Sequence, residues 1–178
     1  MSILTNSPLM SIYQNAIEDS TSDCTSHPES LDLSHTQIEQ IQWLENLSNL
    51  QILNISNTRI KEISGLDKLG CLRELYLSNT EVREVIGIEK LQYLNKIDLR
   101  RTLVKDLTPL LPHIKRGLKV VWDDNLSFFE GKILLYNNPL VHPPVEIVRQ
   151  GNEAILNYFE ELEKKADTLY VAILLILG

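Results

Sequence analysis

An apolar pattern with a fixed spacing of 22 residues runs from Leu31 to Leu126 and limits the possible folds more than any other feature. The aligned residues are Leu31, Leu53, Leu75 and Ile97; Leu33, Ile55, Leu77, Leu99 and Val121; Ile38, Ile60, Val82, Val104 and Leu126; and Ile41, Ile63, Val85, Leu107 and Phe129. A single helix cannot keep so many registers aligned at this spacing. A stack of coils can, because every coil presents the same face to its neighbour. The pattern therefore predicts a solenoid.

Each repeat begins with an apolar–x–apolar triplet, which is the period-2 signature of a short strand. The apolar residues that follow predict a curved return path to the next strand. A small polar residue separates the second register from the third, and its members are Thr36, Thr58, Thr80, Thr102 and Asp124. We expect these side chains to turn inward and bind backbone groups that would otherwise be buried without a partner.

The stretch from Leu50 to Leu69 resembles the 22-residue class of leucine-rich repeat, with threonine where that family often has asparagine. The resemblance implies an α/β solenoid with short parallel strands on its concave side. It also implies irregular or 3-10 return segments and helical caps at both ends.

The chain divides into four predicted segments. Residues 1–30 are expected to hold an N-terminal capping helix, which Ser7 and Pro8 begin, and a Ser/Thr-rich loop. A disordered tail or a degenerate first repeat are the alternatives. Residues 31–142 hold the repeats, with a fifth strand near Lys119–Trp122, a sixth at Ile133–Leu135 and irregular geometry between them. Residues 143–167 are expected to form two C-terminal capping helices, the second from about Asn152 to Ala166.

Residues 168–178 contain a nearly continuous apolar run, Leu169–Leu177. It is too short to span a bilayer as a helix, and it is interpreted as a strand buried on both faces. No membrane span is expected.

The segment from Asn138 to Phe159 resembles the junction in Roco proteins, where leucine-rich repeats lead into a Ras-like GTPase domain called Roc and then a COR dimerisation domain. By this resemblance Leu169–Leu177 is the first Roc strand, and Gly178 is the first glycine of the phosphate-binding loop. The loop's lysine and its Ser/Thr magnesium ligand are absent. GTP, magnesium and contacts with Roc and COR domains are therefore implied only for an intact parent protein, and this chain is not expected to be an enzyme.

Polar side chains within and after the predicted strands should lie on the concave face and form a surface for a protein partner. They are Asp32, Ser34, His35, Asn54, Ser56, Asn57, Glu74, Tyr76, Ser78, Asn79, Lys96, Asp98, Arg100 and Arg101. Arginine pairs and tyrosine are good anchors for a partner's carboxylates and backbone. The alternative is a face that is merely solvated.

The composition argues against other classes of function. The net charge of −7 disfavours a general nucleic-acid binder. Cys24 and Cys71 do not suggest a disulfide framework, and no His/Cys spacing suggests a metal site. Asp123 and Asp124 are interpreted as a turn residue and a member of the threonine register. The N-terminus lacks the pattern of a secretory signal, so the cytoplasm is the expected compartment.

Three functions remain open. The first is the protein-interaction domain of a Roco GTPase. The second is a free-standing regulatory repeat protein, of the phosphatase-regulator or effector type. The third is an enzyme, which the four scattered histidines do little to support.

Overall fold

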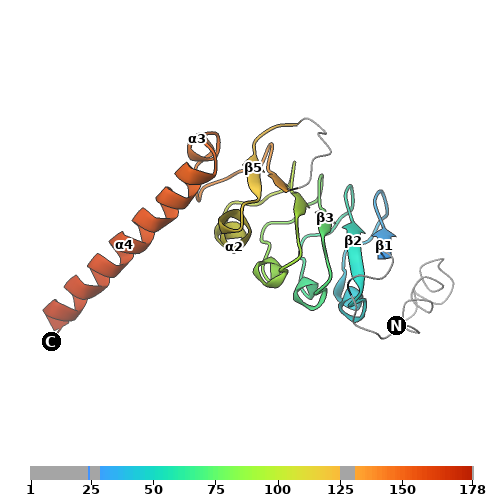
Figure 1. Ribbon diagram of the computed structural model, residues 1–178, viewed down its shortest axis with the longest axis horizontal. Coiled ribbons are helices and arrows are strands. Elements are labelled where there is room, and N and C mark those ends of the chain that lie inside the picture. Colours follow the sequence, from blue (N-terminus) through green and yellow to red (C-terminus); the bar gives the residue numbers. More distant parts are fainter. Residues whose placement is uncertain (1–23, 25–28, 125–130, 178) are drawn as a thin grey trace.

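The computed structural model describes residues 24, 29–124 and 131–177, and its coils share one parallel six-stranded sheet (Figure 1). The strands are β1 (Glu29–Asp32), β2 (Leu50–Asn54), β3 (Glu74–Tyr76), β4 (Lys96–Asp98), β5 (Lys119–Val121) and β6 (Lys132–Leu134). The helices are the 3-10 turns η1 (Gln42–Asn46), η2 (Leu66–Lys68), η3 (Ile88–Lys90) and η4 (Thr108–Leu110), and the α-helices α2 (Leu111–Lys115), α3 (Val145–Val148) and α4 (Asn152–Leu177). The predicted solenoid with short parallel strands is confirmed. Coils 1 to 4 are named here after the strands β1 to β4 that begin them.

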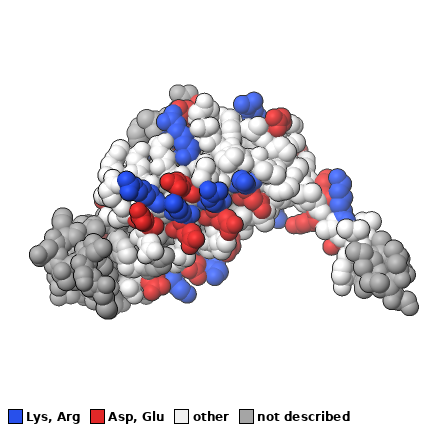
Figure 2. Space-filling view, turned by 180° about the vertical axis from the view of Figure 1, so that it is seen from behind, with Lys and Arg blue, Asp and Glu red and all other residues white. Residues whose placement is uncertain are grey.

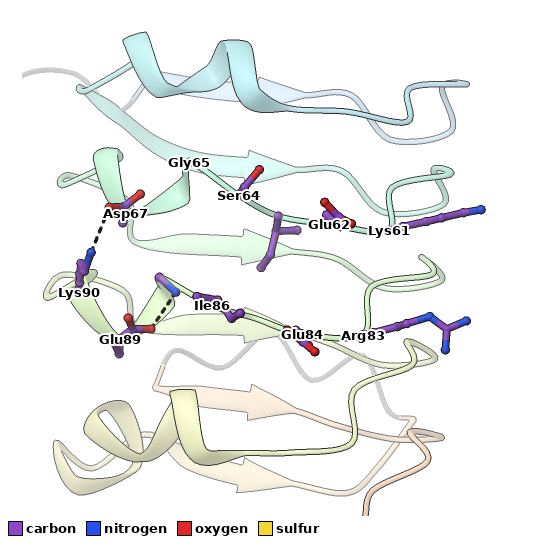
Figure 3. A pocket seen from close by; sticks show the side chains of 12 residues that line it. Lys61, Glu62, Ser64, Gly65, Asp67, Arg83, Glu84, Ile86, Glu89 and Lys90 are labelled. Carbon is purple, nitrogen blue, oxygen red and sulfur yellow. Dashed lines mark hydrogen bonds and ion pairs between the residues drawn. The ribbon is translucent and has the colours of Figure 1, made fainter.

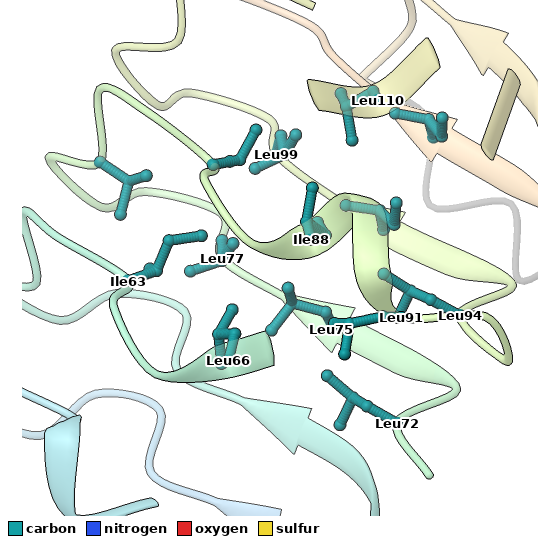
Figure 4. Close-up of a cluster of buried hydrophobic side chains, with 14 of the residues drawn as sticks. Ile63, Leu66, Leu72, Leu75, Leu77, Ile88, Leu91, Leu94, Leu99 and Leu110 are labelled. Carbon is teal, nitrogen blue, oxygen red and sulfur yellow. The ribbon is translucent and has the colours of Figure 1, made fainter. Parts of the chain in front are cut away.

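The 22-residue registers correspond to layers of the core. Leu31, Leu53, Leu75 and Ile97 are paired neighbours in β1 to β4, and all four are buried. Figure 4 shows how leucines and isoleucines of adjacent coils stack on one another. The ladder continues past the strand ends, where backbone amides of one coil donate to carbonyls of the next. Each coil therefore buries its aliphatic edge only because its neighbour is present.

The threonine register behaves as expected for Thr36, Thr58, Thr80 and Thr102. Each hydroxyl lies 2.6 to 3.0 Å from the carbonyl oxygen three residues earlier in its own turn. These bonds satisfy carbonyls that face the core, where an unpaired polar group is costly.

The fifth layer of the core differs from the predicted one, because β6 and not β5 lies next to β4 in the sheet. The sheet order is β1-β2-β3-β4-β6-β5, so β6 pairs with both β4 and β5. Leu135 follows Leu99 in the core, and Asn138 follows Thr102, whereas Asp124 is exposed. β6, whose Ile133 and Leu134 are both buried, occupies the inner position, and β5, which begins with the exposed Lys119, becomes the edge. Leu126 and Phe129 lie outside the described residues.

Cys24 and Cys71 form a disulfide, contrary to the expectation from their spacing. Their Cα atoms are 5.3 Å apart, and 47 positions separate them in the sequence. The carbonyl of Cys24 also accepts hydrogen bonds from Gln51 and Arg73, at 3.2 Å each. Coils 2 and 3 therefore hold Cys24 next to Cys71. The N-terminal helix expected between residues 7 and 17 lies outside the described residues.

The C-terminal end of the stack packs against the first turns of α4. Ile155 and Phe159 join the hydrophobic core, and the side-chain amide of Asn152 binds the backbone of Leu118 and Val120 beside β5. From Glu160 to Tyr170 every residue is exposed, and the helix runs away from the coils (Figure 1).

The strand expected at Leu169–Leu177 is wrong, because α4 continues through Leu177. A strand needs a partner for its backbone groups, whereas a helix pairs its own. No helix within the described residues combines the length and the apolar content that crossing a bilayer demands.

Candidate functional site

The candidate site is the strand face, defined here as the outward side chains of β1 to β4 together with the turns that follow them. The register places Asp32, Asn54, Tyr76 and Asp98 side by side in one row, and Glu74 next to Lys96 in another. The predicted residues thus lie on one face of the sheet, although Ser56, Lys96, Asp98 and Arg100 are buried there. Whether they bind a partner stays a prediction.

Several of these polar residues shape the turn after each strand. The carboxylate of Asp32, the amide oxygen of Asn54 and the carboxylate of Asp98 each accept a bond from the backbone amide two residues later. The next residue has a positive φ in every coil, and these residues are His35, Asn57, Asn79, Arg101 and, after β6, Asn137. Asparagine tolerates this conformation well, which explains its recurrence there.

Hydrogen bonds between coils organise the first half of the face. The amide of Asn54 donates to Asp32 at 3.2 Å, and the hydroxyls of Ser56 and Ser78 lie 3.1 Å apart. His35 and Asn57 remain exposed at the rim, with their side-chain nitrogens 3.4 Å apart. Hydrogen bonds from Ser34 lower the pKa of Asp32, so this carboxylate stays charged at neutral pH.

Tyr76 lies at the centre of the face, between an acid and a base. Its hydroxyl donates to the carboxylate of Glu74, and the ammonium of Lys96 lies 5.0 Å from the centre of its ring. The Glu74 carboxylate and the Lys96 ammonium are 4.0 Å apart. Burial and the neighbouring Glu74 raise the pKa of Tyr76, so its hydroxyl stays protonated. The ring is therefore held in one orientation and is only partly covered.

Arg100 and Arg101 do not form the exposed arginine anchor that the sequence predicts. Arg100 is buried and binds Asp98 through two hydrogen bonds, while its third nitrogen donates to the carbonyl of Asp124. Arg101 is half exposed and pairs with the carboxylate of Asp124 at 2.5 Å. Asp98 and Arg100 neutralise each other within the fold. Of the pair, only Arg101 can reach a partner without breaking a buried contact.

An aromatic pair beyond β4 is not evident from the repeat pattern of the sequence. The rings of Trp122 and Tyr136 have their centres 6.2 Å apart, and Tyr136 is 37% exposed. Tyr136 is the neighbour of Arg100 in the next coil. The backbone amide of Arg101 donates a hydrogen bond to the carbonyl of Tyr136, just as the amide of Asn79 donates to the carbonyl of Arg100. The irregular spacing after β5 hides this register in the sequence.

Comparison with known proteins agrees with the observed layers. Residues 29–68 match a family model described as Leucine Rich repeats (2 copies). This match covers coil 1 and most of coil 2. No curated protein matches the chain.

Among solved structures, the chain is similar to two internalins from Listeria monocytogenes. The internalin InlF is 27% identical with a TM-score of 0.48, over 49% of this chain and 26% of its own. Internalin C2 is 25% identical with a TM-score of 0.45, over 63% of this chain and 41% of its own. The match thus spans less than half of either internalin.

Proposed function

We propose that this chain is a protein-interaction module that binds its partner on the strand face of coils 1 to 3. The main support is the ring of Tyr76, which is partly exposed and is fixed between Glu74 and Lys96 in the middle of a polar surface. A rigid aromatic side chain loses little conformational entropy when it is covered, and tyrosine is enriched among residues that dominate binding energy.

The chemistry of this surface favours a partner that presents cations and backbone amides. The carboxylates of Asp32 and Glu74 keep lone pairs for a further donor beside their bonds within the fold, whereas the guanidinium groups of Arg100 and Arg101 are paired with Asp98 and Asp124. The proposed partner therefore brings lysine or arginine side chains to coils 1 to 3.

The test compares the partly exposed Tyr76 with an exposed tyrosine outside the strand face. After a partner has been isolated with the whole chain as bait, its affinity is measured for the wild type, Tyr76→Ala and Tyr93→Ala. Tyr93 is exposed outside the strand face. We expect Tyr76→Ala to weaken binding at least about 30-fold, as a dominant contact does. Tyr93→Ala should bind like the wild type, and the reverse order would refute the proposed face.

A second candidate is that these repeats are the recognition half of a Roco-type GTPase. The segment from Asn138 to Phe159 supports it by resemblance, while the helical course of Leu169–Leu177 gives the expected Roc strand no support. The coding sequence beyond Gly178 tests this second candidate. A G-K-[S/T] motif within about ten codons favours the Roco parent, and a stop codon favours a free-standing regulator.

Neither candidate function assigns catalysis to this chain. In the described part of the chain the histidines lie apart. His35 is exposed on a turn, His113 is buried against η3, and His142 binds the hydroxyl of Tyr158. That the chain is not an enzyme is part of the proposal, and an assay for GTP hydrolysis with the purified chain is its simplest test.

A cytoplasmic location stays a prediction. The Cys24–Cys71 disulfide counts against it, because disulfides persist mainly in oxidising compartments. A thiol titration of protein taken directly from its source cells would decide the oxidation state.

A further inference from the structure

Two parallel rows of opposite charge run along the return segments of coils 2 to 4. The basic row is Lys61, Arg83 and Lys105, and the acidic row is Glu62, Glu84 and Asp106. The 22-residue repeat places one member of each row in coils 2, 3 and 4, and all six residues are exposed. Figure 2 shows one face of the molecule, on which Lys and Arg side chains gather among Asp and Glu side chains across the middle.

The geometry within each row is unfavourable for an isolated chain. Figure 3 shows Lys61 and Arg83 extending side by side from neighbouring return segments, with Glu62 and Glu84 next to them. Like charges on adjacent strands or coils repel one another. Opposite charges or screening by water must therefore offset the repulsion within each row.

The chain itself neutralises these rows only in part. Lys61 pairs with Glu81 at 3.5 Å, and Asp106 accepts bonds from the backbone amide and hydroxyl of Thr108. Among the described residues, the charged groups of the other four members have no ion-pair partner within 4.0 Å. These members are Glu62, Arg83, Glu84 and Lys105.

A hollow of about 630 Å³ lies beside the rows, between the return segments of coils 2 and 3 (Figure 3). Ile86 lines it and is 65% exposed, which makes it one of the most exposed large apolar side chains of the described coils. A partner that covered Ile86 would exclude water next to the charges and strengthen their attraction.

The two rows are self-complementary under one symmetry operation. A two-fold axis that runs parallel to the rows, between them, carries the basic row of one chain onto the acidic row of a second copy, coil by coil. A two-fold axis perpendicular to the rows in the same plane would place like charge on like. An isologous dimer requires such a self-complementary patch, and the first arrangement supplies it.

We propose that two copies of this chain associate through these rows, with their solenoids side by side and parallel. Lys61 of one chain then faces Glu62 of the other, and coils 3 and 4 repeat the contact with Arg83–Glu84 and Lys105–Asp106. The occupant is a second copy because the chain already carries both halves of the charge pattern at matching spacing. The strand face stays free, so this inference is independent of the partner proposed above.

Charge-swapped variants test the arrangement. The basic-row variant carries Lys61→Glu, Arg83→Glu and Lys105→Glu, and the acidic-row variant carries Glu62→Lys, Glu84→Lys and Asp106→Lys. A control carries Lys115→Glu, Arg149→Glu and Lys164→Glu, which change the net charge as the basic-row variant does, at exposed sites elsewhere. Circular dichroism melts confirm folding, and sedimentation equilibrium up to about 200 µM chain measures association, which covers micromolar dissociation constants.

We expect the wild type to dimerise at low salt and to dissociate at least about tenfold more readily in 0.5 M NaCl, where exposed charges are screened. Each row variant alone should lose at least about tenfold in dimer affinity, while the control stays close to the wild type. An equimolar mixture of the two row variants should regain dimers, because the fully acidic surface meets the fully basic one. A wild type that stays monomeric, or a mixture that does not associate, overturns the proposal.

Discussion

The guanidinium of Arg100 binds the carboxylate of Asp98 through two hydrogen bonds, with Nε 2.9 Å from Oδ1 and Nη2 2.6 Å from Oδ2. Both side chains are buried, so the pair fixes the end of β4 and removes two charges from the strand face. A surface that resembles a basic anchor in the sequence is therefore part of the folded framework.

Arg100→Ala should lower the free energy of unfolding by about 3–5 kcal/mol, because it leaves Asp98 buried without its partner. Arg101→Ala should change it by no more than about 1 kcal/mol, because its pair with Asp124 is exposed. Urea unfolding measures both. The double variant Asp98→Ala/Arg100→Ala should lose less than the sum of its single changes, and simple additivity would refute the buried pair.

Asn138 closes the last coil with four hydrogen-bond contacts. Its amide nitrogen donates to the carbonyls of Leu99 and Leu135 at 2.7 and 2.9 Å, and its oxygen lies 2.6 Å from the Thr102 hydroxyl and 3.2 Å from the Val104 amide. Asn138→Leu has a similar volume but leaves these buried groups unpaired.

We expect Asn138→Leu to lower the free energy of unfolding by about 2–4 kcal/mol. Asn137→Ala, at the exposed neighbouring position with positive φ, should cost about 1 kcal/mol or less. Thermal melts of both variants provide the comparison. Equal destabilisation would show that the amide network is not what closes the coil.

His113 is buried and predicts a dependence of stability on pH. Its Nε2 donates to the carbonyl of Ile88 at 2.7 Å, and its Nδ1 accepts a hydrogen bond from Arg116. Burial and the Arg116 cation lower the pKa of His113 from 6.5, although the Ile88 bond and Glu89 oppose them. The unfolded chain therefore binds more protons than the folded chain just below pH 6.5.

The free energy of unfolding should fall as the pH drops below about 6.5, by up to about 1.4 kcal/mol per pH unit from this group. The melting temperature measured from pH 7.5 to 5.5 reveals the slope. His113→Gln should flatten it, whereas His142→Gln, at an exposed histidine, should leave it unchanged. A slope that survives in His113→Gln would assign the pH dependence to other groups.

The Cys24–Cys71 disulfide should stabilise the folded chain by about 4 kcal/mol, since it closes a loop across 47 positions. Melting with and without dithiothreitol measures this contribution. The double variant Cys24→Ser/Cys71→Ser is the control, and its melting temperature should not respond to the reductant. A wild type that also fails to respond would contradict the cross-link.

The sequence predicts the regular part of this fold because the 22-residue registers and the threonine positions are visible directly in the spacing of the residues. It fails after coil 4, where β6 follows β5 too closely for a full coil and takes the inner place in the sheet. The burial of Arg100 depends on Asp124, which only that irregular segment brings near.

Two other failures have different physical causes. The pairing of Cys24 with Cys71 requires the N-terminal segment to lie against coils 2 and 3, which no periodicity encodes. An apolar run such as Leu169–Leu177 is compatible with a buried strand or a helix, so periodicity alone cannot decide between them.

The central claim is that successive coils share one backbone ladder, on which the strand face depends. The amides of Leu33, Ile55, Leu77 and Leu99 each donate to the following layer, at 2.7 to 2.9 Å. Native-state hydrogen exchange by NMR tests this ladder most directly. We expect these four amides to exchange only through large-scale unfolding and with similar free energies. Exchange at the rate of an unstructured peptide at any of them would contradict the stacked solenoid.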